Sequence, residues 1–397
     1  MSSTVTIEKL VYGGDGLARL DGQIVLTPYV LPGERINLTT ERAKAGLLRG
    51  SAPEVLEPSP QRIAPRCEYF GACGGCQYQH SAYEYQLEQK VAILRETLQR
   101  IGGIAYECDI PTISGEPWFY RNRVQLHFAA GASGFHRHGS HDLCAIDHCY
   151  IAAPVLVDAI ARIAEAVKRP EWPNFVRSLE LFTNGAELQI NVLETARPVA
   201  ARFFSWCRSF LPHIVSGAID YDAAGFRFRI SGGSFFQVNQ FLIDALVEEA
   251  LSDSAGVHAI DLYAGVGLFS LPLARRFERV ESVERGGSAF RDLEYNCREE
   301  QRVQAVRGSA ESYLDNAGKR PDLLIADPPR AGLGAKAVAA LLRLKPKRLT
   351  VVSCDPATLA RDARMLLAEY RIRRIALVDL FPQTYHFETV MQLEAPV

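Results

Sequence analysis

The C-terminal part of the sequence alternates short apolar runs with amphipathic stretches of helical length, and this pattern restricts the fold more than any other feature. From residue 257 onward the apolar runs are VHAIDLY, RVESVE, VQAVRG, DLLIADPP, RLTVVSC and IALVDL. Strands that alternate with helices in this way form a mostly parallel sheet with helices on both faces. The sequence therefore predicts an α/β Rossmann-like domain, which we place at residues 236–397.

Two further segments precede this domain. Residues 1–57 are short strand-like runs separated by glycine turns, a pattern typical of a small β-barrel. Residues 58–235 follow a proline-rich stretch and combine an expected helix from Tyr83 to Arg100 with a β-rich part from residue 111. A chain of 397 residues, 48% of them hydrophobic, can bury more than one core. We therefore expect three domains, at 1–57, 58–235 and 236–397.

The charge of the whole chain does not by itself indicate a nucleic-acid partner. The net charge is −2, so RNA would have to be bound by local basic patches. In the N-terminal segment Arg35, Arg42, Lys44 and Arg49 are candidates for phosphate contacts, and an ordinary solvated basic face is the alternative.

The segment WFYRNR in the middle of the chain mixes aromatic and basic side chains. This combination suits the stacking and clamping of unpaired bases, although the same residues fit an amphipathic strand. The residues concerned are Trp118, Phe119, Tyr120, Arg121 and Arg123.

No apolar run approaches the roughly 20 residues needed to span a bilayer. The N-terminus MSSTVTIEKL also lacks a basic segment followed by an apolar one. We therefore expect a cytoplasmic protein with no membrane contact.

The segment AIDLYAGVGLFSLPLA has the form of a nucleoside-cofactor loop. In this segment an acidic residue lies at the end of a strand, Gly265 and Gly267 follow it, and a helix begins. Glu284 lies at the end of the next strand, where its carboxylate can accept hydrogen bonds from a ribose. Phe269 and Ser270 stand where a dinucleotide fingerprint would continue, which disfavours NAD and favours S-adenosylmethionine. A plain strand–turn–helix is the alternative reading.

Two further motifs are expected at the same crevice. Asp327 in DPPR and Cys354 in VVSCDP each follow an apolar strand of the predicted parallel sheet. Methyltransferases that act on amino groups carry an aromatic residue after such a double proline, and here Arg330 stands instead. Cys354 precedes a helix N-terminus, which would stabilise a thiolate, whereas a buried structural cysteine is the alternative.

A thiolate beside S-adenosylmethionine suggests methylation of carbon 5 of uracil. That carbon is a poor nucleophile, and addition of a thiolate to carbon 6 converts the ring into an enolate that can attack a methyl group. A base must then remove the proton from carbon 5. Glu388 in FPQTYHFETV is our candidate for this base, and His386 is its competitor.

Three of the nine cysteines, Cys67, Cys73 and Cys76, are bunched in the spacing C-x5-C-x2-C. In a reducing cytoplasm such a group is more often a metal site than a disulfide framework. A fourth ligand would be Cys144 or Cys149, and four thiolates fit either a [4Fe-4S] cluster or a structural zinc.

Nearly the whole chain resembles the RNA uracil-5-methyltransferase family, and within it the iron–sulfur-containing branch that acts on 23S ribosomal RNA. The resemblance rests on SFFQVN, DLYAGVGLFSLPLA, IADPPRAGL, VVSCDPATLARD and FPQTYHFETV. Residues 1–57 resemble a TRAM domain, an RNA-binding barrel.

The resemblance implies roles for particular residues. It implies that Cys354 is the nucleophile, that Glu388 is the base, that Cys149 is the fourth cysteine ligand and that the metal group is a [4Fe-4S] cluster. Some relatives have asparagine where this chain has Leu268. The implied contacts of S-adenosylmethionine fall on Gln237, Tyr263, Gly265, Glu284, Ser309 and Asp327.

Three functional hypotheses follow. The first is methylation of a uridine in 23S ribosomal RNA by a monomer that needs no protein partner. The second keeps the chemistry and moves it to a uridine in the T-loop of transfer RNA. The third is a non-catalytic RNA-binding or redox-sensing protein that uses the barrel and the cysteines.

Overall fold

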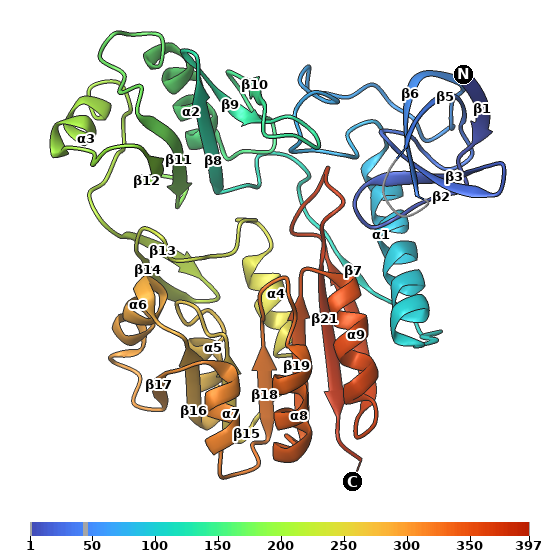
Figure 1. Cartoon of the computed structure of the whole chain (residues 1–397). Helices are drawn as coiled ribbons and strands as arrows, with labels where there is room; N and C mark the ends of the chain where they lie inside the picture. Colours follow the sequence, from blue (N-terminus) through green and yellow to red (C-terminus); the bar gives the residue numbers. More distant parts are fainter. Residues whose placement is uncertain (1, 43–46, 397) are drawn as a thin grey trace.

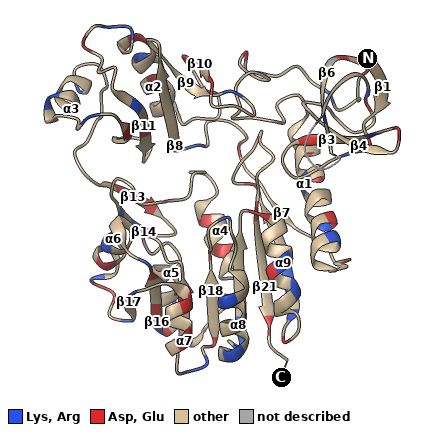
Figure 2. Cartoon of the chain, viewed as in Figure 1, with Lys and Arg blue, Asp and Glu red and all other residues tan. Residues whose placement is uncertain are grey.

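A computed structural model describes residues 2–42 and 47–396, and arranges them in three parts (Figure 1). Lys44 lies outside the described residues. Both positive and negative side chains occur in each part (Figure 2), in keeping with a net charge near zero. None of the helices in the described ranges has the length and apolar character needed to cross a membrane.

The N-terminal part is a curved six-stranded sheet in the order β1-β5-β6-β4-β3-β2. Its core contains Ile7, Val25, Ile36 and Leu38, which alternate with outward-facing polar residues. Its strands are β1 (Ser2–Thr6), β2 (Lys9–Leu10), β3 (Asp15–Leu20), β4 (Gln23–Pro28), β5 (Arg35–Arg42) and β6 (Leu48–Glu57).

Two of the basic residues expected to contact RNA phosphates in this sheet have acidic partners. Arg35 pairs with Glu57 at 2.5 Å and Arg49 pairs with Asp15 at 3.4 Å. Both arginines remain partly exposed, but part of their charge is already neutralised, so they are weaker phosphate ligands than the sequence suggests.

The middle part holds a five-stranded antiparallel sheet in the order β10-β9-β8-β11-β12. The apolar face of α2 (Pro154–Ala166) packs in the same core as this sheet. Residues of α3 (Ala201–Cys207) belong to this core as well. The strands are β8 (Arg123–Ala129), β9 (Ala132–His136), β10 (Leu143–Ala145), β11 (Val176–Thr183) and β12 (Leu188–Thr195).

The C-terminal part is the predicted Rossmann-like domain. Its eight-stranded sheet has the order β17-β16-β15-β18-β19-β21-β20-β7, and β15 to β19 pair in parallel while β21 runs antiparallel to both neighbours. The strands are β15 (Gly256–Leu262), β16 (Phe277–Glu284), β17 (Val303–Arg307), β18 (Leu323–Ala326), β19 (Arg348–Ser353), β20 (Arg371–Val378) and β21 (Glu388–Glu394).

Helices cover both faces of this sheet, as the sequence predicts. The neighbours Ala259 and Ile260 of β15 belong to different cores, one shared with α4, α5 and α6 and the other with α7, α8 and α9. The helices are α4 (Ile243–Ala250), α5 (Ser270–Ala274), α6 (Gly287–Cys297), α7 (Ala310–Asn316), α8 (Gly334–Leu344) and α9 (Pro356–Leu366).

Some elements from the segment 58–235 pack against the C-terminal sheet. The helix α1 (Tyr83–Thr97), continued by the π-helix η2 (Leu98–Gly102), shares the core of α9, and β7 (Thr112–Ile113) pairs with β20. The hairpin of β13 (Ile219–Ala223) and β14 (Phe226–Ile230) joins the core around α4. The cores therefore cross the expected boundaries, because the apolar faces of these elements are covered by the C-terminal domain.

β15 and β18 are neighbours in the middle of the sheet. The chain adds β16 and β17 on one side of this pair and β19 on the other, so the strand order reverses between β15 and β18. In open α/β sheets, ligands bind in the crevice at the carboxyl ends of the strands at such a point. The motifs singled out in the sequence follow β15, β16, β18 and β19, so the fold collects them at one edge.

Candidate active site

The glycine loop after β15 has the backbone that a nucleoside site requires. Tyr263 and Gly265 have φ values of 61° and 56°, and a Cβ on Gly265 would meet nothing within 4 Å, so space is open beside the loop. The Gly265 amide donates to the Glu284 carboxylate at 3.0 Å. Buried Asp261 accepts a hydrogen bond from the Ser270 hydroxyl at 2.6 Å and thereby joins the strand to the following helix.

The other expected cofactor contacts lie at the ends of neighbouring strands. Glu284 ends β16, and Ser309 caps α7, with its hydroxyl accepting from the Ser312 amide at 3.1 Å. Leu268, where some relatives have asparagine, is buried in the apolar core and offers no polar contact. An open glycine loop flanked by carboxylates fits a nucleoside with a cationic methyl donor.

Gln237 and Asp327 meet across the crevice. The Gln237 side-chain amide donates to the Asp327 carboxylate at 3.2 Å, although the two residues are 90 positions apart. Burial raises the pKa of Asp327 to about 7. The Gln237 carbonyl in turn accepts from the Asn122 side chain at 3.0 Å, which anchors this residue to the middle part.

Cys354 lies in the turn between β19 and α9, and its side chain is half-buried. The Asp355 side chain caps α9 by accepting from the Ala357 and Thr358 amides at 2.9 Å. Burial and the nearby Glu388 carboxyl raise the pKa of the Cys354 thiol to about 12, while Arg330 lowers it. Burial and the neighbouring carboxylates thus oppose the thiolate that the helix N-terminus is expected to favour.

This environment predicts slow alkylation of Cys354 in the absence of RNA. Because only the thiolate reacts, the rate should keep rising about tenfold per pH unit between about pH 8 and 10, where an ordinary cysteine with a pKa near 8.5 levels off. Iodoacetamide labelling read by mass spectrometry of the Cys354 peptide measures this, with exposed Cys108 as internal reference. A plateau for Cys354 below about pH 9 contradicts the prediction.

Glu388 is the first residue of β21 and only 5% of it is exposed. Its Oε2 atom has no hydrogen-bond partner among the described residues. Burial and the Asp327 carboxylate raise its pKa well above the usual range. A carboxylate in this environment binds a proton tightly once it is ionised, which suits a base whose proton comes from carbon.

His386 is a poorer candidate for the base. Burial and the positive charge of Arg330 lower its pKa to about 3, so the imidazole holds a proton only weakly. One ring nitrogen lies 3.3 Å from the Arg330 guanidinium, which occupies the lone pair that a base would use. The electrostatics therefore favour Glu388.

Arg330 is a site residue whose role sequence reasoning missed. Its positive charge lowers the pKa values of both Cys354 and Glu388. The sequence holds a signal for it, since Arg330 follows the DPP motif at a strand end, but the motif does not indicate which ionisable groups the guanidinium faces. Its charge favours the ionised forms of Cys354 and Glu388.

The loop before Glu388 is fixed by elements from all over the chain. The Tyr120 hydroxyl donates to the Pro382 carbonyl at 3.0 Å, and the Gln77 and Tyr78 amides both donate to the Gln383 carbonyl at 3.0 Å. Buried Lys90 of α1 pairs with buried Asp379 at 2.7 Å. These contacts hold the candidate base on a rigid support.

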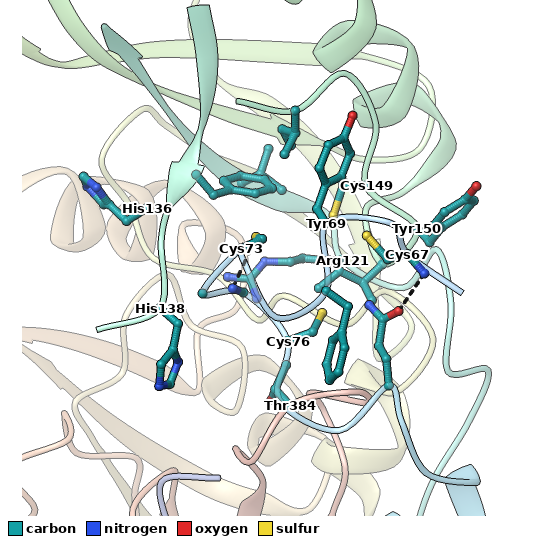
Figure 3. A pocket seen from close by; sticks show the side chains of 18 of the residues that line it. Cys67, Tyr69, Cys73, Cys76, Arg121, His136, His138, Cys149, Tyr150 and Thr384 are labelled. Carbon is teal, nitrogen blue, oxygen red and sulfur yellow. Dashed lines mark hydrogen bonds between the residues drawn. The ribbon is translucent and has the colours of Figure 1, made fainter. Parts of the chain in front are cut away.

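A cavity of about 400 Å³ is lined by Cys67, Cys73, Cys76 and Cys149, together with Arg121 (Figure 3). Cys144 is buried in the core of the middle sheet and does not line this cavity. Of the two candidates for a fourth ligand that the residue spacing leaves open, Cys149 is therefore the one that faces the other three.

The spacing of these sulfur atoms bears on the kind of metal group. Within the described ranges, no three of the four sulfurs lie within 4.8 Å of one another. A single tetrahedral zinc, about 2.3 Å from each thiolate, would hold the sulfurs about 3.8 Å apart. Four thiols around an open cavity fit a larger group better.

The same cavity reaches the catalytic crevice. Its wall includes Arg330, Thr384 and His386 from the loops around the candidate nucleophile and base. The cysteines are far from Cys354 along the chain, but they line the same cavity as the loop that precedes Glu388. A group bound to the cysteines would therefore support that loop.

The expectation that residues 118–123 present a base-stacking surface is wrong in part. Tyr120 is fully buried, and Arg123 is mostly buried, where it pairs with Glu180 at 3.1 Å. The rings of Trp118 and Phe119 lie against the Arg66 guanidinium, and their centroids are 5.1 and 5.4 Å from its Cζ atom. The sequence pattern does not distinguish contacts within the protein from a surface free to bind RNA, since both use aromatic and basic residues.

Comparisons with known proteins identify the family of the chain. Residues 212–395 match the family model of tRNA (uracil-5-)-methyltransferases, and residues 3–52 match the TRAM domain. An RNA methyltransferase of Aquifex aeolicus is 32% identical over 98% of each chain. An RNA methyltransferase of Streptomyces coelicolor is 33% identical over 98% of this chain and 92% of its own.

A solved structure matches the complete architecture. The tRNA (uracil-54, C5)-methyltransferase of Pyrococcus abyssi, in complex with S-adenosyl-L-homocysteine, superposes with a TM-score of 0.79 and 27% identity. The match covers 99% of this chain and 100% of the archaeal one, so it includes the N-terminal sheet, the middle part and the Rossmann-like domain.

Proposed function

This chain belongs to the S-adenosylmethionine-dependent RNA uracil-5-methyltransferases, and from that premise we propose that it methylates carbon 5 of a specific uridine in 23S ribosomal RNA. The observation that carries the proposal is the shared crevice of Cys354, Glu388 and the glycine loop, in which the Glu388 carboxyl lies close enough to Cys354 to raise the pKa of its thiol.

The reaction uses the two side chains in turn. The Cys354 thiol gives its proton to solvent and adds through Sγ to carbon 6 of the uracil, which makes carbon 5 nucleophilic. S-adenosylmethionine, when bound, supplies the electrophilic methyl group that carbon 5 attacks. Glu388 then takes the carbon-5 proton, the sulfur–carbon 6 bond breaks, and the sulfur leaves as a thiolate. Arg330 lowers the free-energy cost of both ionised forms.

The methyl donor would be held by side chains from four strand ends. Glu284 would accept hydrogen bonds from the ribose, and Gly265 would let the backbone approach the ligand. Gln237, Tyr263, Ser309 and Asp327 complete the proposed contact set. The Gln237–Asp327 hydrogen bond joins two members of this set.

We propose that Cys67, Cys73, Cys76 and Cys149 hold a [4Fe-4S] cluster, with structural zinc as the alternative. The open cavity and the wide spacing of the sulfurs support the cluster. Gln77 and Tyr78, which directly follow Cys76, donate to the Gln383 carbonyl in the loop before Glu388. A cluster at this position would therefore act structurally on the catalytic loop.

Cys149→Ser is expected to remove the cluster, and Cys144→Ser is its matched control because Cys144 lies in the apolar core. Protein purified without oxygen should show absorbance near 400 nm and about four iron atoms and four sulfides per chain. The Cys149 variant should lose most of the iron, and the Cys144 variant should keep it. Zinc without iron in the intact protein, or unchanged iron in Cys149→Ser, contradicts this assignment.

Two observations bear on the RNA substrate. The four-cysteine constellation supports 23S ribosomal RNA, because the branch of the family that the chain resembles both carries an iron–sulfur cluster and acts on this RNA. The full-length match to a protein named as a transfer RNA methyltransferase supports transfer RNA as the second candidate. The presence of the N-terminal barrel and of the middle domain therefore does not decide between the two RNA substrates. A cytoplasmic monomer without a protein partner is proposed for either.

Mass spectrometry of nucleosides decides between the substrates. The chain is incubated with S-adenosylmethionine and either 23S ribosomal RNA or transfer RNA from a strain that lacks the enzyme. The proposal expects 5-methyluridine in the 23S ribosomal RNA only. Product in transfer RNA alone would keep the reaction and replace the substrate, whereas no 5-methyluridine in either RNA would overturn the proposed function.

A further inference from the structure

The turn between β2 and β3 of the N-terminal sheet docks onto the catalytic domain. Leu10, at the end of β2, is buried in the same core as Leu94 of α1 and Phe387. Next to it, Lys9 pairs with Glu96 of α1 at 2.5 Å. The turn is therefore held by apolar burial in a core that it shares with the catalytic domain, and by an ion pair to α1, which packs against that domain.

The close approach of this turn depends on a glycine. Gly14 has a φ of 92°, and a Cβ there would lie 2.9 Å or less from side-chain atoms of Gln77 and 3.4 Å from the Tyr385 ring. The sheet that matches the TRAM domain thus touches both the residue after Cys76 and the loop before Glu388.

Tyr12, in the middle of this turn, reaches the nucleophile's own backbone. Its hydroxyl donates to the Cys354 carbonyl at 2.8 Å, across 342 positions of sequence. Its ring packs edge-on against Tyr385 and Phe387, with centroids 5.3 and 5.8 Å away. One side chain therefore contacts both the turn that carries the nucleophile and the loop that precedes the base.

The side-chain hydrogen bonds within the nucleophile's turn are local, since Ser353 and Asp355 bond to each other and Asp355 caps α9. On one side the turn is also joined to the base through the sheet, because Ser353 of β19 pairs with Thr389 of β21, the residue after Glu388. Tyr12 adds a contact to the turn from outside this sheet. Burial raises the pKa of the Tyr12 hydroxyl far above its ordinary value, so it remains a donor under all working conditions.

We propose that Tyr12 is a positioning residue, through which the N-terminal RNA-binding domain fixes the nucleophile's turn relative to the base loop. The inference rests on the proposed function for its catalytic consequence. Its structural consequence, that the Cys354 turn is held from outside the catalytic domain, stands without it.

Tyr12→Phe tests the hydrogen bond and keeps the ring contacts. With the RNA that the enzyme methylates, kcat is expected to fall about three- to tenfold while KM for RNA changes less than twofold, since the lost bond orients Cys354 and does not bind RNA. Tyr29→Phe is the matched control, because the Tyr29 hydroxyl has no hydrogen-bond partner in the described structure. It should leave both constants unchanged.

Hydrogen exchange supplies a reading that needs no substrate. In Tyr12→Phe, peptides spanning residues 353–358 should exchange faster than in the intact chain, and Tyr29→Phe should not change them. Unchanged exchange and unchanged kcat in Tyr12→Phe overturn the proposal. If the intact chain methylates neither RNA, the proposed function fails, and the exchange data alone decide whether Tyr12 holds the turn.

Discussion

Cys354→Ala is expected to abolish methyl transfer, with a loss in kcat/KM of at least about three orders of magnitude. The loss is large because alanine cannot add to carbon 6, and uracil carbon 5 remains unreactive without that addition. Transfer of a labelled methyl group to RNA measures the rate. Binding of RNA and of S-adenosylmethionine should change little, since Cys354 is only half-buried and the substitution removes a single sulfur atom.

The matched control for this substitution is Cys108→Ala. Cys108 is exposed and its side chain lies in no site described above. The variant should methylate RNA at the rate of the intact chain. Methyl transfer by Cys354→Ala at more than about a tenth of that rate would exclude Cys354 as nucleophile.

Glu388→Gln is expected to trap the enzyme on its RNA. The amide keeps the size of the side chain but cannot take the carbon-5 proton, so the covalent complex forms, accepts the methyl group and cannot break down. Turnover should fall about 10²- to 10⁴-fold. A band of protein joined to RNA that survives denaturation on a gel, and disappears after RNase treatment, measures the trapped species.

Two further variants make this experiment decisive. Adding Cys354→Ala to Glu388→Gln should abolish the trapped band, because no covalent bond can form. His386→Asn should not trap the complex, since the low pKa of His386 and its contact with Arg330 make it a poor base. A trapped band in His386→Asn but not in Glu388→Gln would identify His386, and not Glu388, as the base.

The sequence predicts the C-terminal domain well for a physical reason. The central parallel strands β15, β18 and β19 are almost fully buried toward their carboxyl ends, and the parallel strands end at the same edge. Apolar runs in the sequence therefore mark the strands, and the residue after each run lies at the crevice. Gly265, Glu284, Asp327 and Cys354 were all found in this way, and they lie at the ends of β15, β16, β18 and β19.

What the sequence does not reveal depends on contacts between distant segments. Tyr12 meets Cys354 across 342 positions, and no local pattern marks a hydroxyl that will meet a carbonyl so far away. The protonated state of Cys354 likewise follows from burial beside Glu388, whereas the sequence showed only a helix N-terminus. For Tyr120 the sequence predicts a contact that the structure does not allow, because its aromatic ring is fully buried in the protein and cannot stack on a bound base.

The central claim is that the methyl group goes to carbon 5 of uracil, and tritium release tests it most directly. RNA transcribed with uridine labelled by tritium at carbon 5 is incubated with the chain and S-adenosylmethionine carrying a ¹⁴C-labelled methyl group. We expect one tritium released to water for each methyl group incorporated, and no release with Cys354→Ala. Methyl incorporation without tritium release would contradict the account, because the acceptor would then be another atom of the RNA.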